Sequence, residues 1–304
     1  MASDKKQLEG LRDRIDEIDA HIHDLIMERT EVVEGVRKVK DSLGSKVMIR
    51  PSREAEVLYR LMERHKGPFP KQEIARIWRE LIVATCSFEG PFSVAVYHPE
   101  DEPGYWDLAR DQYGAFTPMT RHTAARRVVE AVQNGEATLG IVPIPKRDDD
   151  ENWWRHIVSE HKDTPRIIAR LPFIGTGNAR NSGLEALVIC PVLHEETGRD
   201  RSYIAIEATA DIGYNVIKIA LAKANYIVAF NQNWHDPSRP PGWFYFIEVF
   251  GFINPDGRQA KKLMGALGKK INRIVHLGGY ATPLNKQDLK QIKKSSGKPK
   301  NDHP

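Results

Sequence analysis

An arginine interrupts an apolar seam in the N-terminal part of the chain. Hydrophobic residues recur there at steps of three and four, the spacing of one face of an α-helix. The seam consists of Leu8, Leu11, Ile15, Ile18, Ile22, Leu25, Val32, Val36 and Val39. Arg29 stands between Leu25 and Val32, where the next apolar residue is due. Because a cation in such a seam is costly unless an anion meets it, Arg29 either faces water or binds a negatively charged partner.

Two further cations on the same predicted helix have informative spacings. Lys40 follows Arg29 by eleven residues, so their side chains lie within roughly 20° of each other, about three turns apart. Arg12 precedes Arg29 by seventeen residues and is rotated from it by roughly 100°. One helix cannot direct both arginines at one small ligand, whereas an antiparallel second copy brings its own Arg12 beside Arg29. The spacing therefore favours a dimer with shared sites.

Four residues on two later helices extend this polar set. Arg53 and Glu54 begin one helix, and Thr85 and Glu89, four residues apart, share a face of the next. With the three cations of the first helix they can line a small, dry pocket between helices. Arginine binds carboxylates through paired hydrogen bonds, so the expected ligand is a compact dicarboxylate.

A plainer interpretation stands beside this one. Taken singly, Arg12, Lys40 and Arg53 are explained as solvated surface residues, as most Lys and Arg are. Glu54 and Glu89 are equally compatible with ordinary helix-surface acids, and Thr85 with core packing. Arg29 fits this interpretation less well, because a seam position is vacated for it.

The elements that must position these residues are predicted to be three helices. The first covers residues 5–41 without an internal proline, a length that suggests a coiled coil or an intertwined bundle. Pro51 opens the second, which the segment KGPFP ends. The third covers residues 71–88 and is closed by Gly90 and Pro91.

Strands alternate with helices after this module, which predicts an α/β lobe. The expected strands are FSVAVY, TLGIVPI, PRIIARL and LEALVIC, with a helix in RHTAARRVVEAVQNG. Residues 201–281 then follow the order β-α-β-β-α-β of a ferredoxin-like fold. The predicted domains are a helical domain (1–90), an α/β region (91–200), a ferredoxin-like domain (201–283) and a basic disordered tail (284–304).

Bulk composition excludes several classes of protein. The 304 residues carry a net charge of +4, too small to indicate nucleic-acid binding, and much of it lies in the C-terminal tail. The two cysteines have no His/Cys cluster around them, which excludes a disulfide framework and a zinc site of familiar spacing. Neither a signal peptide nor a membrane span is predicted. We expect a cytoplasmic protein that does not bind membranes or nucleic acid.

Residues 5–90 resemble the all-helical chorismate mutases, in the version fused to prephenate dehydratase in bacterial P-proteins. The segments that carry the resemblance are LEGLRDRIDEIDAHIHDLIMERTEVVEGVRKVK, RPSREAEVLYRL and IARIWRELIVATCSFEGPFSVAVY. The resemblance implies an intertwined homodimer that rearranges chorismate to prephenate with no cofactor. Arg29 and Arg53 match the arginines that hold the substrate carboxylates, and Arg12 matches the one supplied by the partner subunit.

The remaining site residues match groups near the reacting bond. Lys40 matches the lysine at the ether oxygen, and Glu54 the carboxylate that takes the ring hydroxyl. Thr85 falls where the family usually has Ser, and Glu89 where it has Gln or Glu, also at the ether oxygen. Glu89 can donate a hydrogen bond there only when protonated, so we expect activity to decline as the pH rises through neutrality. One departure is visible: the loop before the second helix reads MIRPS, where the family often has Asp.

The rest of the chain resembles prephenate dehydratase and the ACT regulatory domain only in part. TPMTRHTAARRVVEAVQNGEATLGIVPI follows the dehydratase pattern, but the Thr-Arg-Phe catalytic motif is missing and PIPKR replaces PIENS. In the ACT-like part, IGYNVI and FNQNWHDP replace the phenylalanine-binding segments. The leading hypothesis is a monofunctional chorismate mutase with degenerate extensions. A bifunctional mutase–dehydratase and a non-catalytic amino-acid sensor or partner-binding protein are the alternatives.

Overall fold

The computed structural model describes residues 2–42, 49–86, 90–147, 149, 151–176, 183–237 and 242–290. The chain divides into two compact units. One contains residues 1–48 and 84–90, and the other contains residues 49–83 and 91–304. The domain boundaries expected from the sequence at residues 90, 200 and 283 remain predictions.

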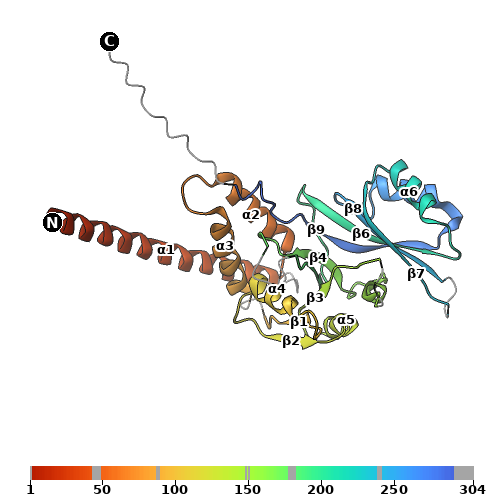
Figure 1. The fold of residues 1–304 in the computed structure, drawn as a ribbon, viewed down its shortest axis with the longest axis horizontal. Helices are drawn as coiled ribbons and strands as arrows, with labels where there is room; N and C mark the ends of the chain where they lie inside the picture. Colours follow the sequence, from red (N-terminus) through yellow and green to blue (C-terminus); the bar gives the residue numbers. More distant parts are fainter. Residues whose placement is uncertain are drawn as a thin grey trace, which may run out of the picture. The chain divides into compact units, whose positions relative to one another are not determined.

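The first unit is dominated by one long helix, α1 (Ala2–Ser42). It runs without interruption, as Figure 1 shows, so the helix predicted over residues 5–41 is confirmed. Gly10 and Gly35 do not break it. An isolated helix gains little from propensity alone and depends on covering an apolar face. That face is uncovered in the single chain, because the nine seam residues are between 44% and 64% exposed.

Helices α2 (Pro51–Arg64) and α3 (Lys71–Cys86) confirm the other two predicted helices. Pro51 is the first residue of α2, a position that suits proline because its missing N–H would have no intrahelical partner. The two helices share an apolar cluster with the C-terminal part of the chain, formed by Ala55, Leu58, Tyr59, Met62, Ala75, Phe173, Ala281 and Leu284. Ordered packing therefore extends past residue 283, and residues 291–304 lie outside the described part.

Nine strands form one mixed sheet in the order β2-β1-β3-β5-β4-β9-β6-β8-β7. The first five in the chain are β1 (Val94–Tyr97), β2 (Met119–His122), β3 (Leu139–Pro143), β4 (Arg166–Leu171) and β5 (Ala186–Cys190). β1 is parallel to both β2 and β3, whereas β5 is antiparallel to β3 and β4. The four predicted strands of the α/β region are confirmed.

Two elements of this region differ from the prediction. Helix α4 (Gly104–Tyr113) is absent from the prediction, and it begins at a Pro-Gly pair, a dipeptide more typical of turns than of helices. The stretch predicted as one helix over residues 121–135 contains the end of β2, followed by α5 (Ala125–Gln133). β2 is an edge strand with two exposed central residues, so it lacks the alternating apolar pattern by which strands are recognised.

The ferredoxin-like order is confirmed over residues 200–281. It comprises β6 (Asp200–Ala208), α6 (Tyr214–Lys223), β7 (Val228–His235), β8 (Trp243–Phe250), α7 (Arg258–Leu267) and β9 (Arg273–Ala281). Both helices pack over one face of the sheet through a cluster that includes Ile206, Leu221 and Leu263 (Figure 1). β9 also pairs with β4 of the α/β region, so the two regions share one continuous sheet.

The opposite face of this sheet covers a second apolar cluster, which includes Leu187, Phe246 and Val275. Trp153 and Trp154, in the short helix η2 (Trp153–Ile157), are fully buried there. The Trp154 ring stacks on Phe246 with ring centroids 5.0 Å apart, and its Nε1 donates to Gln232 Oε1 at 3.0 Å. A second short helix, η3 (Gly268–Lys270), follows α7.

Candidate functional site

Three of the predicted site residues lie along α1. Arg12 is exposed, and Arg29 and Lys40 are half-buried. Seventeen residues separate Arg12 from Arg29, which corresponds to about 26 Å along a helix axis. A single copy of α1 therefore keeps these two guanidinium groups too far apart to hold one small ligand together.

Arg53 and Glu54 are brought together in the first turn of α2. The Arg53 side chain is exposed and its Nη1 donates to Glu56 Oε2 at 3.2 Å. Glu54 is more enclosed, with 15% of its side chain exposed, and Arg79 Nη1 on α3 donates to its Oε2. The two neighbours thus have different environments: Arg53 can turn towards a ligand, whereas Glu54 is held by a buried cation.

Arg79 is the most enclosed cation of this pair of helices. Its side chain is only 4% exposed, and its guanidinium carbon lies 5.8 Å from the centre of the Phe173 ring. Its Nε has no hydrogen-bond partner among the described residues. Removing one member of a buried ion pair costs about 3–5 kcal/mol because the other charge is left uncompensated. Arg79 therefore keeps the Glu54 side chain in place.

The other two predicted site residues lie near the end of the helical module. Thr85 is half-buried in the last turn of α3, and Glu89 lies outside the described residues. Thr85 belongs to the same compact unit as Arg12, Arg29 and Lys40, whereas Arg53 and Glu54 belong to the other unit. The roles of all seven residues remain predictions.

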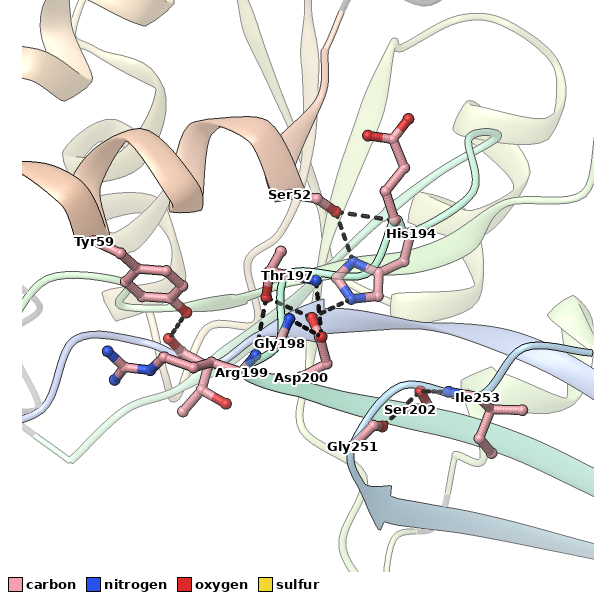
Figure 2. Close-up of polar contacts among 12 residues, drawn as sticks. Ser52, Tyr59, His194, Thr197, Gly198, Arg199, Asp200, Ser202, Gly251 and Ile253 are labelled. Carbon is pink, nitrogen blue, oxygen red and sulfur yellow. Dashed lines mark hydrogen bonds and ion pairs between the residues drawn. The ribbon is translucent and has the colours of Figure 1, made fainter. Parts of the chain in front are cut away.

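A buried polar network fixes the N-terminal turn of α2 (Figure 2). Ser52 Oγ lies 3.0 Å from His194 Nδ1, and His194 Nε2 lies 2.9 Å from Asp200 Oδ1. An ionised carboxylate only accepts hydrogen bonds, so Nε2 carries a proton, and in a neutral ring Nδ1 accepts from the Ser52 hydroxyl. The backbone N–H of Glu195 donates to the same hydroxyl at 3.0 Å.

Asp200 is the anchor of this network. It also accepts hydrogen bonds from the Thr197 hydroxyl at 2.7 Å and from the backbone N–H groups of Thr197 and Gly198, both at 2.9 Å. Burial opposes its ionisation, but the hydrogen bonds from His194 and Thr197 outweigh burial and lower the pKa of the carboxyl below its usual value.

Ser52, His194 and Asp200 are linked in the same order as a hydrolytic triad, but the Ser52 hydroxyl is too buried to act as a nucleophile on a substrate. Ser52 is 4% exposed, so a substrate carbonyl cannot reach its oxygen. The network instead fastens the start of α2 to the segment that enters β6. An exposed ion pair, Arg50 with Glu195 at 2.8 Å, joins the same two segments at the surface. Arg53 and Glu54 follow directly, so the network sets where these two side chains begin.

Ser52, Arg79, His194 and Asp200 were not identified from the sequence. Ser52 is 142 residues from His194, and Arg79 is 25 residues from Glu54, so no local spacing connects these pairs. His194 and Asp200 are only six residues apart, but that spacing alone does not indicate a buried pair. One signal was available for Arg79. It lies four residues after Ala75 and four before Val83, both buried, so it occupies the buried stripe of α3.

The described residues contain no group of three or more His, Cys, Asp or Glu side chains placed to hold a metal ion. Within the same part of the chain, no helix combines the length and hydropathy that crossing a bilayer requires.

Residues 11–90 match the chorismate mutase type II family. The N-terminal helical region is a chorismate mutase type II domain. The match includes Arg12, Arg29, Lys40, Arg53, and the segment with Thr85 and Glu89.

Two proteins with similar sequences are described as bifunctional enzymes. The chain is 35% identical over 148 residues to the bifunctional chorismate mutase/prephenate dehydratase of Pseudomonas aeruginosa, covering 47% of this chain and 40% of that protein. It is 35% identical over 147 residues to the enzyme of the same description from Stutzerimonas stutzeri, covering 47% and 40%. The aligned part thus spans well under half the length of these relatives.

Solved structures similar to this one include a prephenate dehydratase from Arthrobacter aurescens, with a TM-score of 0.48 and 13% identity, covering 64% of this chain and 92% of that one. A prephenate dehydratase from Streptococcus mutans has a TM-score of 0.47 and 13% identity, covering 63% and 98%.

Proposed function

We propose that the protein is a chorismate mutase that rearranges chorismate to prephenate. The observation that carries this proposal is the family match over residues 11–90 together with the cations retained inside it. Arg29 takes a position in the apolar seam, and Lys40 lies on the same face of α1. An ordinary surface arginine would not be expected at a position of the apolar seam, which Arg29 occupies.

The reaction suits side chains that bind without reacting covalently. The rearrangement is intramolecular and builds negative charge on the ether oxygen as the C–O bond breaks. Donors fixed beside that oxygen stabilise the transition state more than the ground state. Lys40 is the permanent donor, and Glu89 supplies a second hydrogen bond when protonated. Arg29 and Arg53 hold the two carboxylates and favour the compact, reactive conformer.

The active form in this proposal is a homodimer with shared sites. The seam of α1 exposes nine apolar side chains in the single chain, and an exposed face of this extent is characteristic of an interaction surface. The partner that fits it is a second copy of α1, because an antiparallel pairing buries both seams and delivers Arg12 of one copy near Arg29 of the other. Two sites per dimer then follow from the symmetry.

Arg29→Ala is the discriminating substitution. We expect kcat/KM for chorismate to fall by at least about a hundredfold, because the carboxylate clamp is lost, while the dimer and its helical circular dichroism persist. Arg14→Ala is the matched control, since Arg14 is an exposed arginine of the same helix that pairs with Glu17. Unchanged turnover in Arg29→Ala refutes the proposed site and favours a non-catalytic role for the helical module.

A second activity, prephenate dehydration, is suggested by the names of the relatives. The chain offers a cavity of about 670 Å³ where the parallel strands β1 and β3 end, at Tyr97 and Pro143. Such strand ends are common ligand sites in α/β proteins. The charged side chains that line this cavity are Asp101, Glu102, Lys146, Asp149, Glu151 and Glu185.

Five carboxylates against one lysine repel a dianionic substrate such as prephenate. This charge and the missing Thr-Arg-Phe motif favour the monofunctional enzyme. Phenylpyruvate release from prephenate, measured with the full chain, separates the two: we expect none above the uncatalysed rate. Enzymatic release would establish the bifunctional alternative.

A further inference from the structure

A second cavity lies between the helical module and the α/β lobe, within one compact unit. Its volume is about 370 Å³, and it is bounded by α3, α4 and the segment after β4. Leu108, Pro172, Phe173 and Ile174 form an apolar wall. A volume of this size is in the range of small-molecule sites.

The rest of the lining carries both signs of charge. Arg76 and Arg79 on α3 and Arg110 on α4 contribute guanidinium groups. The acids on the lining are Glu80, Asp107 and Asp111. A plain anion would meet three carboxylates here, and a plain cation would meet three guanidinium groups. A molecule that carries one charge of each sign meets an opposite charge in both sets.

Arg79 adds an independent sign that the cavity accepts a ligand. It is the deeply buried cation of the lining, with 4% of its side chain exposed. Glu54 accepts from its Nη1, but its Nε has no partner among the described residues. A buried N–H without an acceptor is unfavourable, and most native structures avoid it. A small shift of the guanidinium towards a carboxylate in the cavity would supply the missing acceptor.

We propose that this cavity binds a free amino acid with an apolar side chain. The carboxylate of the ligand pairs with Arg79 and with the more exposed Arg76 and Arg110. Its ammonium group faces the acids of the lining, and its side chain packs on the wall around Phe173. The site is formed by α3, α4 and residues 172–174, and it uses no residue of the ferredoxin-like elements.

The proposed site is connected to Glu54 through Arg79. A ligand carboxylate that draws the Arg79 guanidinium towards the cavity weakens the hydrogen bond from its Nη1 to Glu54, so Glu54 shifts when the cavity is occupied. The expected consequence is a higher KM for chorismate in the presence of the amino acid. This consequence rests on the proposed mutase function, whereas binding to the cavity does not.

Calorimetric titration of the full chain tests the binding directly. The probes are L-leucine and L-phenylalanine, with 3-phenylpropanoate and 2-phenylethylamine as analogues that each lack one charge. We expect saturable binding of at least one amino acid and at least tenfold weaker binding of both analogues. Absence of binding by both amino acids overturns the proposal, and equal binding of 3-phenylpropanoate overturns the assignment of a zwitterion.

Substitutions at the rim locate the bound molecule. Arg76→Gln and Arg110→Gln change exposed residues, so the fold is retained, and we expect each to weaken binding at least tenfold. Arg60→Gln is the matched control, because Arg60 is an exposed arginine on α2 outside this lining. Binding that is unchanged in both rim variants places the ligand elsewhere and overturns the site.

Chorismate kinetics test the connection to Glu54 separately. We expect the amino acid to raise KM at least threefold in the parent protein and to leave KM unchanged in Arg110→Gln. An unchanged KM in the parent, with calorimetric binding intact, overturns the connection through Arg79 but leaves the binding site standing. Absence of any chorismate turnover contradicts the mutase proposal instead.

Discussion

Removal of the Asp200 carboxylate is expected to destabilise the unit that contains α2 and the sheet. Asp200 accepts four hydrogen bonds, from His194 Nε2, the Thr197 hydroxyl and the backbone N–H groups of Thr197 and Gly198, all between 2.7 and 2.9 Å. A hydrogen bond to a charged group contributes about 1.5–3 kcal/mol, but contributions within one network do not add.

The expected loss in free energy of unfolding follows from the hydrogen-bond donors that Asp200→Ala leaves without an acceptor. His194 Nε2 loses its acceptor in a buried position, and the orientation of the ring towards Ser52 is no longer fixed. The backbone N–H of Gly198, in an exposed residue, loses its acceptor as well. Breaking a buried pair in this way costs about 3–5 kcal/mol, a large fraction of the about 5–15 kcal/mol by which a domain is stable. Asp200→Asn keeps one acceptor oxygen and should lose about half as much.

Urea denaturation followed by tryptophan fluorescence measures this loss, because Trp153 and Trp154 are buried in the core of the same unit. Asp256→Ala is the matched control: Asp256 is exposed and should change the free energy of unfolding by less than about 0.5 kcal/mol. If the free energy of unfolding of Asp200→Ala lies within about 1 kcal/mol of the parent value, the network does not fasten α2 to the segment before β6.

The pH dependence of this difference has a definite sign. The pKa of Asp200 is lowered in the folded protein, so its carboxylate stabilises the fold fully above the pKa of the unfolded chain, about 3.9. That contribution is lost as the pH falls through the folded-state pKa. The parent protein and Asp200→Ala should therefore differ most near neutral pH and converge in strong acid.

Three further outcomes are expected. Gly278→Ala should prevent folding or lower the free energy of unfolding, measured in urea, by more than about 3 kcal/mol. The reason is that φ at Gly278 is +109° and an added Cβ would overlap the Ile167 carbonyl. Stability equal to that of the parent protein would contradict this. Burial lowers the pKa of His276 to about 4, so as the pH drops from about 6.5 towards 4 the unfolded chain binds a proton that the folded protein does not, and the free energy of unfolding falls. This loss amounts to about 3 kcal/mol over the interval, and His276→Gln should remove most of it. An unchanged pH dependence in His276→Gln would exclude His276 as its source. Glu89→Gln should flatten the decline of kcat/KM with rising pH, and a parent enzyme with constant kcat/KM from about pH 5 to 9 would refute a protonated Glu89.

The helices and strands followed from local pattern to a large extent. The period of the apolar residues on α1 and the short apolar runs of β6 and β8 are properties of neighbouring residues, so they can be read from the chain itself. Elements without such a pattern escaped prediction. The edge strand β2 has exposed central residues, and α4 begins at a Pro-Gly pair.

The chemical types of the side chains at the candidate site follow from the amino-acid sequence. Helical geometry is short-range, and it alone shows that Arg29 replaces an apolar seam residue. It also predicts the faces on which Lys40, Arg53 and Glu54 lie. The tertiary structure alone decided that Glu54 is held by Arg79 and that Asp200 fastens α2 through His194 and Ser52. These contacts join residues far apart in the chain, and their strength comes from burial, which no spacing along a sequence reveals.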